Sequence, residues 1–214
     1  ITTGDSNTAI GFEALKTEDT ASANTAVGYQ AGKVSNSVYG GNVFVGYQSG
    51  LNSTTAYGNA FFGDSSGLLN TTGVDNVAVG ASALRANTTA SNNVAVGKSA
   101  LTANTTGASN VAVGSSAGSA ITTGVENTLV GFETGDALTD ADFNVAMGRL
   151  ALSADTLGSR SVAIGWGALR VQNFTTATNT YNTAVGMNAG TAVTTGSQNT
   201  FIGGLAGDAT TTAS

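Results

Sequence analysis

The sequence predicts an all-β protein: a parallel β-solenoid, or β-roll, of about twelve coils of 17 residues each. Three observations support this fold class. A glycine recurs at a nearly fixed interval, a short apolar run bounded by asparagine precedes each of these glycines, and the intervening segments are rich in Thr, Asn, Ser and Gly. The pattern covers the chain from end to end, which predicts a single repeat domain, residues 1–214, cut from a longer fibre protein.

The central glycine of each copy sets the period. Nine of the eleven spacings are 17 residues, one is 18 and one is 21. A unit this short cannot hold a helical hairpin, and its apolar run between asparagine and glycine is typical of a strand. Stacked coils would place these strands in register about 4.8 Å apart. The central glycines are Gly11, Gly28, Gly46, Gly63, Gly80, Gly97, Gly114, Gly131, Gly148, Gly165, Gly186 and Gly203.

An asparagine stands four residues before the central glycine in eleven copies, and Ser161 replaces it in the other. Stacked at a bend, asparagine amides can hydrogen-bond along the axis as they do in cross-β stacks. We therefore predict a structural ladder of Asn24, Asn42, Asn59, Asn76, Asn93, Asn110, Asn127 and Asn144. The glycines, including Gly28, Gly46, Gly63, Gly80, Gly97 and Gly114, are predicted to serve turns with positive φ or close backbone approach.

The three residues between asparagine and glycine would place apolar or small side chains on both faces of the strand. The middle position is usually Ala, but Phe44, Phe61, Leu129 and Phe201 also occupy it. A strand buried on both sides needs cover on both sides. One cover can be the interior of the roll, and we predict that the other is a sister subunit in a homotrimer.

Composition excludes several classes of function. Charged residues make up 9% of the chain, the net charge is −6, and His and Cys are absent. Without a basic stripe, nucleic acid is not an expected partner, and without a long apolar run, membrane insertion is not expected. Catalytic triads and common zinc sites usually need His or Cys, which this chain lacks. The sequence also has no glycine-rich phosphate loop before a helix and no distinct pair of carboxylates for glycoside hydrolysis. We predict no enzyme activity and no cofactor.

The stretches "NTAVGYQAG" at 24–32 and "NVAVGKSAL" at 93–101, with their "NTTG" links, resemble the repeats of bacteriophage tail fibres and related cell-surface fibres. "SVAIG" at 161–165 is similar, more distantly, to coils of trimeric autotransporter adhesin heads. The resemblance implies a left-handed, trimeric β-roll that mediates attachment to a host cell or surface glycan. It also implies an extracellular location or one on the virion surface.

Candidate ligand-binding residues lie in two places. The position after the central glycine varies from coil to coil and includes Tyr29, Tyr47 and Trp166, whose rings could stack on sugars or instead seal the coil edge. The 21-residue spacing adds a four-residue insertion within 170–182, which includes Phe174 and Tyr181. Insertions in solenoids often form binding loops, although a tolerated surface bulge is the alternative.

Three further hypotheses remain open from the sequence. Asp136, Asp140 and Asp142 could ligate Ca²⁺, but they lack the spacing of a calcium loop and also suit a solvated turn. Repeated "TT" pairs, such as Thr71-Thr72, suggest an ice-binding solenoid as the alternative function, although adjacent threonines point to opposite faces of a strand. A glycan-cleaving fibre enzyme is the third class.

Overall fold

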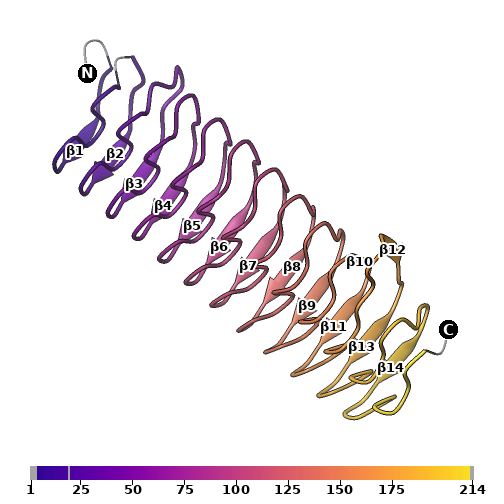
Figure 1. The fold of residues 1–214 in the computed structure, drawn as a ribbon. Helices are drawn as coiled ribbons and strands as arrows, with labels where there is room; N and C mark the ends of the chain where they lie inside the picture. The colour runs from indigo at the N-terminus through magenta and orange to yellow at the C-terminus, as the bar shows by residue number, and fades with distance from the viewer. Residues whose placement is uncertain (1–3, 19, 213–214) are drawn as a thin grey trace.

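The computed structural model describes residues 4–18 and 20–212 as a rod of stacked coils (Figure 1). Twelve short strands form one parallel sheet, in which each strand pairs in register with the corresponding strand of the next coil. The alanines of the β5 and β6 strands, Ala78 and Ala95, are one such pair. The predicted all-β parallel solenoid is confirmed, with a coil of about 17 residues.

Each strand of the large sheet has only three residues. Each coil is named after the strand that it contains. The strands are β1 Thr8–Ile10, β2 Thr25–Val27, β3 Val43–Val45, β4 Ala60–Phe62, β5 Val77–Val79, β6 Val94–Val96, β7 Val111–Val113, β8 Thr128–Val130, β9 Val145–Met147, β11 Val162–Ile164, β13 Thr183–Val185 and β14 Thr200–Ile202. A second parallel sheet has two strands, β10 Gly158–Ser159 and β12 Thr178–Asn179.

The middle residue of each strand points into the roll. Phe44, Phe61 and Leu129 have no exposed surface, and neither do the alanines at this position in the coils from β5 to β7. The residues on either side of the middle point outward and are half-buried or exposed in the single chain. The large side chains therefore find cover inside their own subunit, and the two flanking rows form the uncovered face.

The large side chains of the interior come either from the strand or from the wall that faces it. The residue four positions after the central glycine faces the strand's middle residue and is either Leu or Gly. Five coils have a leucine here, and in each of them the middle residues of that strand and of the next strand are both Ala: the leucines are Leu15, Leu84, Leu101, Leu152 and Leu169.

The remaining coils have a glycine at this position because a side chain would collide. A Cβ placed on any of them would lie 2.2–2.9 Å from the nearest atom of a bulky middle side chain in the same or the next coil. Real Cβ atoms do not approach other heavy atoms that closely. The glycines are Gly32, Gly50, Gly67, Gly118, Gly135, Gly190 and Gly207.

Leucine and glycine adopt the same left-handed backbone here, so the path of the coil does not change with the residue. Leu84 has φ 52° and Gly67 has φ 57°. A left-handed conformation costs a residue with a Cβ about 1–2 kcal/mol. Complete burial of a leucine side chain contributes about 1.5–3 kcal/mol, which is sufficient to offset that cost.

The central glycines stack into a column along the rod. Gly28, Gly46, Gly63, Gly80, Gly97 and Gly114 have φ between 131° and 140°, and a Cβ on any of them would lie 2.2–2.7 Å from the carbonyl oxygen of the next glycine in the column. Both of the predicted reasons for glycine, positive φ and close approach of backbone, therefore apply at these positions.

Candidate binding surfaces

The ladder asparagines are buried and join successive coils by hydrogen bonds. The backbone N–H of each donates to the Oδ1 of the asparagine one coil earlier, at 2.8–3.1 Å. The Nδ2 group of most of them also donates to a carbonyl oxygen 14 residues further on, as Asn93 does to Gly107. Asn24, Asn42, Asn59, Asn76, Asn93, Asn110, Asn127 and Asn144 thus hold the bend of the coil and present nothing to a ligand.

Ser161 interrupts the ladder, and a glutamine replaces the missing amide. The side chain of Gln172 is fully buried, and its Nε2 donates to Ser161 Oγ at 2.9 Å. Its Oε1 accepts from Asn182 Nδ2 at 2.8 Å. The same Nε2 also donates to the buried carboxylate of Asp155 at 2.6 Å. The sequence pattern did not single out Gln172, because only the fold brings it against Ser161.

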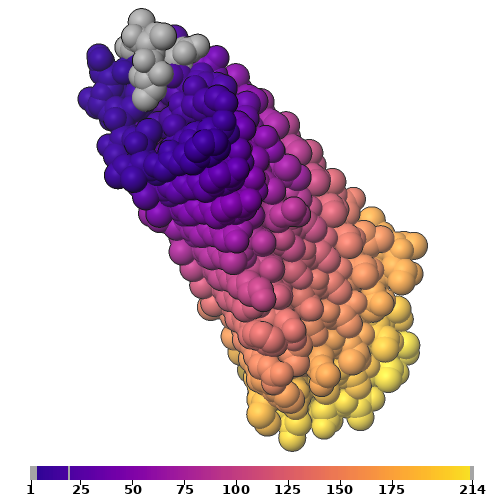
Figure 2. Space-filling view, turned by 60° about the vertical axis from the view of Figure 1, so that its left-hand side comes forward, coloured from indigo at the N-terminus to yellow at the C-terminus, as the bar shows by residue number. Residues whose placement is uncertain are grey.

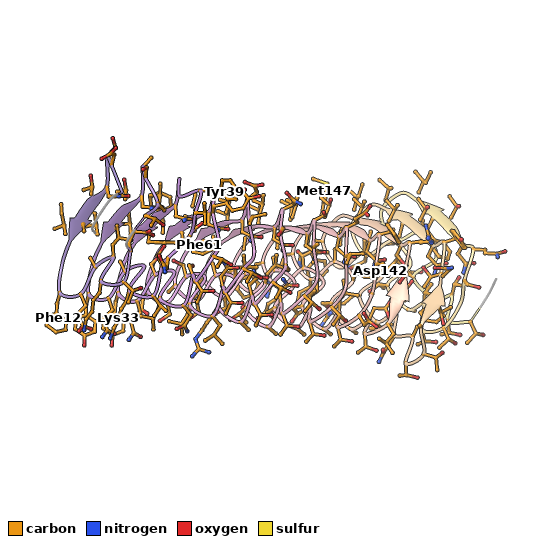
Figure 3. The ribbon with its side chains drawn as sticks, turned by 90° about the horizontal axis from the view of Figure 1, so that it is seen from above. Phe12, Lys33, Tyr39, Phe61, Asp142 and Met147 are labelled. Carbon is orange, nitrogen blue, oxygen red and sulfur yellow. The ribbon has the colours of Figure 1, made fainter. Side chains whose placement is uncertain are left out.

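The outer sheet face consists of the two outward positions of every strand in the large sheet. It contains only Thr, Val, Ala, Ile, Phe and Met, with no charged residue. Its exposed members include Val79 at 38% and Met147 at 41% of their surface. Figure 3 shows Met147 and Tyr39 along one side of the rod, with Phe12 and Lys33 along the opposite side. This face runs the length of the rod and carries no charge, which is typical of an interaction surface.

The row that follows the central glycines begins with a stack of aromatic rings. Phe12 and Tyr29 are 5.4 Å apart between ring centres and Tyr29 and Tyr47 are 5.2 Å apart, with interplanar angles of 13° and 7°. Parallel rings this close overlap in the offset-stacked arrangement. The faces of Tyr29 therefore contact other protein rings, and its edge is what remains for a ligand.

A charged and amide row runs beside this stack. Gln48 donates to Gln30 at 2.9 Å, and Gln30 donates to Glu13 at 2.9 Å. Lys16 and Lys33 pair with the two oxygens of Glu13 at 2.6 and 2.7 Å. The hydrogen bonds from Lys16, Lys33 and Gln30 lower the pKa of Glu13 to about 2. The two lysines share this single carboxylate, so the three side chains together keep one positive charge.

Further along the same row, Trp166 is 40% exposed and follows Arg149 one coil earlier. The Arg149 guanidinium lies 5.6 Å from the ring centre of Phe132. None of the ring pairs in residues 4–18 and 20–212 includes Trp166. Trp166 therefore has no other ring stacked against it, unlike Tyr29 and Tyr47.

The insertion at 170–182 forms a lobe built around the two-stranded sheet. A lobe in the orange of these residues projects from the rod in Figure 2. Phe174 is only 8% exposed, and its N–H donates to Asp155 Oδ1 at 2.9 Å. It therefore anchors the lobe to the roll and leaves no ring for a ligand. Tyr181 is 54% exposed and remains a candidate.

The threonine pairs at the opposite corner form another ladder. The first threonine of a pair donates its hydroxyl to a carbonyl of the next coil, as Thr71 does to Thr88 at 2.8 Å and Thr88 does to Thr105 at 3.0 Å. The hydroxyls of this row are therefore already used within the protein, while the second threonine, such as Thr72 or Thr89, is exposed. The pairs therefore leave a single row of exposed threonines at this corner, whereas the ice-binding hypothesis asks for threonines at alternate positions of one strand face.

The acidic residues of the 136–142 region are spread over separate contacts. Asp142 accepts from the backbone N–H of Val125 at 2.8 Å, and burial raises the pKa of Asp136 above its usual value. In the part of the chain that the structure describes, no group of three or more acidic side chains could hold a metal ion, and no pocket is present. The same residues include no helix of the length and hydropathy needed to cross a membrane.

Comparison of the chain with protein-family models, curated proteins and solved structures gives no match. The functional argument therefore rests on the surfaces described above.

Proposed function

We propose that this chain is a structural and adhesive segment of a fibre, which associates as a homotrimer and attaches to a cell surface or a surface glycan. The observation that supports it most strongly is the outer sheet face, an uncharged apolar strip along the whole rod. Such a fibre would act outside the cell or on a virion, as the resemblance of the repeats implies.

The length and rung spacing of the face favour self-association more than its area does. Twelve strands about 4.8 Å apart and three residues wide give a strip of roughly 500 Å² on each copy, somewhat below the ~800 Å² per partner of a standard interface. Side chains at the rim would add to this area. A second copy of the same chain is the natural partner, because its strip has the same length and the same spacing between rungs.

A charge-insertion experiment tests the assembly. We expect light scattering after size exclusion to give three times the mass of the chain at micromolar concentration. The double variant Val79→Lys/Val96→Lys places two charges on the outer sheet face and should be monomeric, because a buried unpaired charge is costly. The control Thr89→Lys/Thr106→Lys adds the same charge at exposed corner positions and should remain trimeric. A folded, monomeric wild type would overturn the proposal.

Attachment is tested separately on a panel of glycans and on whole cells. Trp166 has the exposed ring best suited to stack on a sugar, and loss of such an aromatic contact weakens binding by several-fold. We expect Trp166→Ala to reduce glycan retention while the trimer mass stays unchanged. If the wild-type trimer binds none of the glycans and none of the cell types, the segment acts only as a spacer in the fibre.

A further inference from the structure

An arginine lies between two exposed aromatic residues on the three coils next to the insertion lobe. Phe143, Arg160 and Tyr181 each occupy the position just before the ladder residue, in the β9, β11 and β13 coils. All three have a left-handed backbone, with φ of 60°, 65° and 52°. Equivalent positions and similar dihedrals direct the three side chains outward from one corner of the rod. All three are exposed.

The guanidinium of Arg160 is held in place without a carboxylate. Its Cζ lies 4.5 Å from the ring centre of Phe143, within the range of a cation–π contact. Its Nε donates to Asn179 Oδ1 at 3.1 Å. Within residues 4–18 and 20–212, Arg160 has no ion pair and its two Nη groups have no hydrogen-bond acceptor. These nitrogens therefore remain available to an anion.

Neither of the two nearest acidic residues that precede Arg160 in the sequence pairs with it. Asp155 is buried and accepts from Gln172 and from Phe174 N–H. Asp142 lies one coil earlier, and its Oδ1 accepts from Val125 N–H in the coil before that. Of the seven cationic residues of the chain, only Lys16 and Lys33 form an ion pair within residues 4–18 and 20–212. Arg160 differs from the other cations without an ion pair because, among the described residues, it alone combines an aromatic contact with a side-chain hydrogen bond.

The insertion supplies the other parts of the arrangement. Its strand β12 pairs with β10, which places Ser159 beside Asn179. Asn179 then orients Arg160, and Tyr181 follows directly on the exposed side of the lobe. Buried contacts of Phe174 and Gln172 fix the lobe to the roll, so the polar groups above it have a rigid base.

We propose that Phe143, Arg160, Asn179 and Tyr181 form a surface site for an acidic saccharide. The planar guanidinium would bind a carboxylate or sulfate with its two free Nη groups, and the flanking rings would contact the apolar face of the sugar. The inference rests on the proposed function, because it names the class of surface glycan to which the fibre attaches.

Titration of the purified chain tests this site with a matched pair of probes, an oligogalacturonate and its methyl ester. We expect the acid to bind and the ester to bind at least about tenfold more weakly, because a charge-assisted, two-point contact is lost. Arg160→Gln should weaken binding of the acid by a similar factor. Arg160→Lys retains the charge but lacks the planar guanidinium with its two Nη groups, so it should give an intermediate loss of affinity for the acid.

Arg149→Gln is the control, because it removes the same charge from another aromatic neighbour, Phe132, on the other row. Its affinity for the acid should stay within about twofold of wild type, and a sulfated oligosaccharide that binds through Arg160 would support the same site. Equal losses from both glutamine variants, equal binding of acid and ester, or no binding of acidic probes would overturn it. If the trimer retains neutral glycans and Arg160→Gln changes nothing, this site fails while the proposed function stands.

Discussion

The β4 and β5 coils fill the same interior from opposite walls. In β4 the strand contributes Phe61 and the facing position is Gly67, whereas in β5 the strand contributes Ala78 and the facing position is Leu84. The backbone at the facing position is left-handed in both. In these two coils a large side chain thus occupies either the middle of the strand or the facing position, but not both. The variation between Gly and Leu at the facing position therefore depends on the residue in the strand.

The largest effect is expected from filling both walls of one coil. Gly67→Leu would place a Cβ 2.3 Å from Phe61 Cε2, with the rest of the leucine directed at the same ring. We expect a loss of about 3 kcal/mol or more in the free energy of unfolding, at the upper end of overpacking costs. Chemical denaturation checks this value.

The double variant Phe61→Ala/Gly67→Leu is the matching control. It converts the β4 coil into the β5 type and should recover most of the loss. Phe61→Ala alone should cost about 3–5 kcal/mol, because it leaves a cavity. A double variant that is no more stable than either single variant would contradict the coupling between positions 61 and 67.

The reverse conversion gives the next largest effect. Leu84→Gly removes a fully buried side chain and should destabilise the fold by about 3 kcal/mol. Adding Ala78→Phe should restore much of that stability, because the preceding coil already has Gly67 at the position the new ring would approach. Thermal unfolding of the single and double variants measures the coupling, and strictly additive effects would argue against it.

The asparagine ladder is common to both kinds of coil, so its loss should cost the same in each. Asn59→Ala in the β4 coil and Asn76→Ala in the β5 coil each remove the acceptor of a buried N–H, that of Asn76 and of Asn93 respectively. Unpaired buried groups cost about 1–3 kcal/mol each, so we expect about 2–3 kcal/mol in both variants by denaturant unfolding. A clear difference between the two would show that the ladder depends on the core type.

The smallest effect concerns Asp136, next to Gly135 in the β8 coil, which has the bulky Leu129. Burial raises the pKa of Asp136, so its folded state favours the protonated form and stability from this group increases as the pH falls through that pKa. Asp136→Asn should therefore unfold at a slightly higher temperature than wild type at pH 7. The two should converge near pH 3, where Asp136 is protonated, and a larger difference at pH 3 would reverse the sign.

The candidate sites show where sequence reasoning ends. It named Tyr29, Tyr47, Trp166 and Tyr181 from their positions in the repeat, and all four are exposed. It also named Phe174, which the fold buries, because an insertion does not reveal which of its residues anchors it. Arg160 was missed, since its pairing with Phe143 and Asn179 depends on contacts between coils.

The sequence by itself determined the period, the strand in each coil, and the asparagine and glycine columns, because a fixed spacing repeats the same local chemistry at every rung. Only the tertiary structure decided which face of the strand is the interior. Both faces are apolar in sequence, and only the closing of the coil places Phe61 inside and Val79 outside. It also decided how Gln172 replaces the amide missing at Ser161, since contacts 11 residues apart form only when the coil closes.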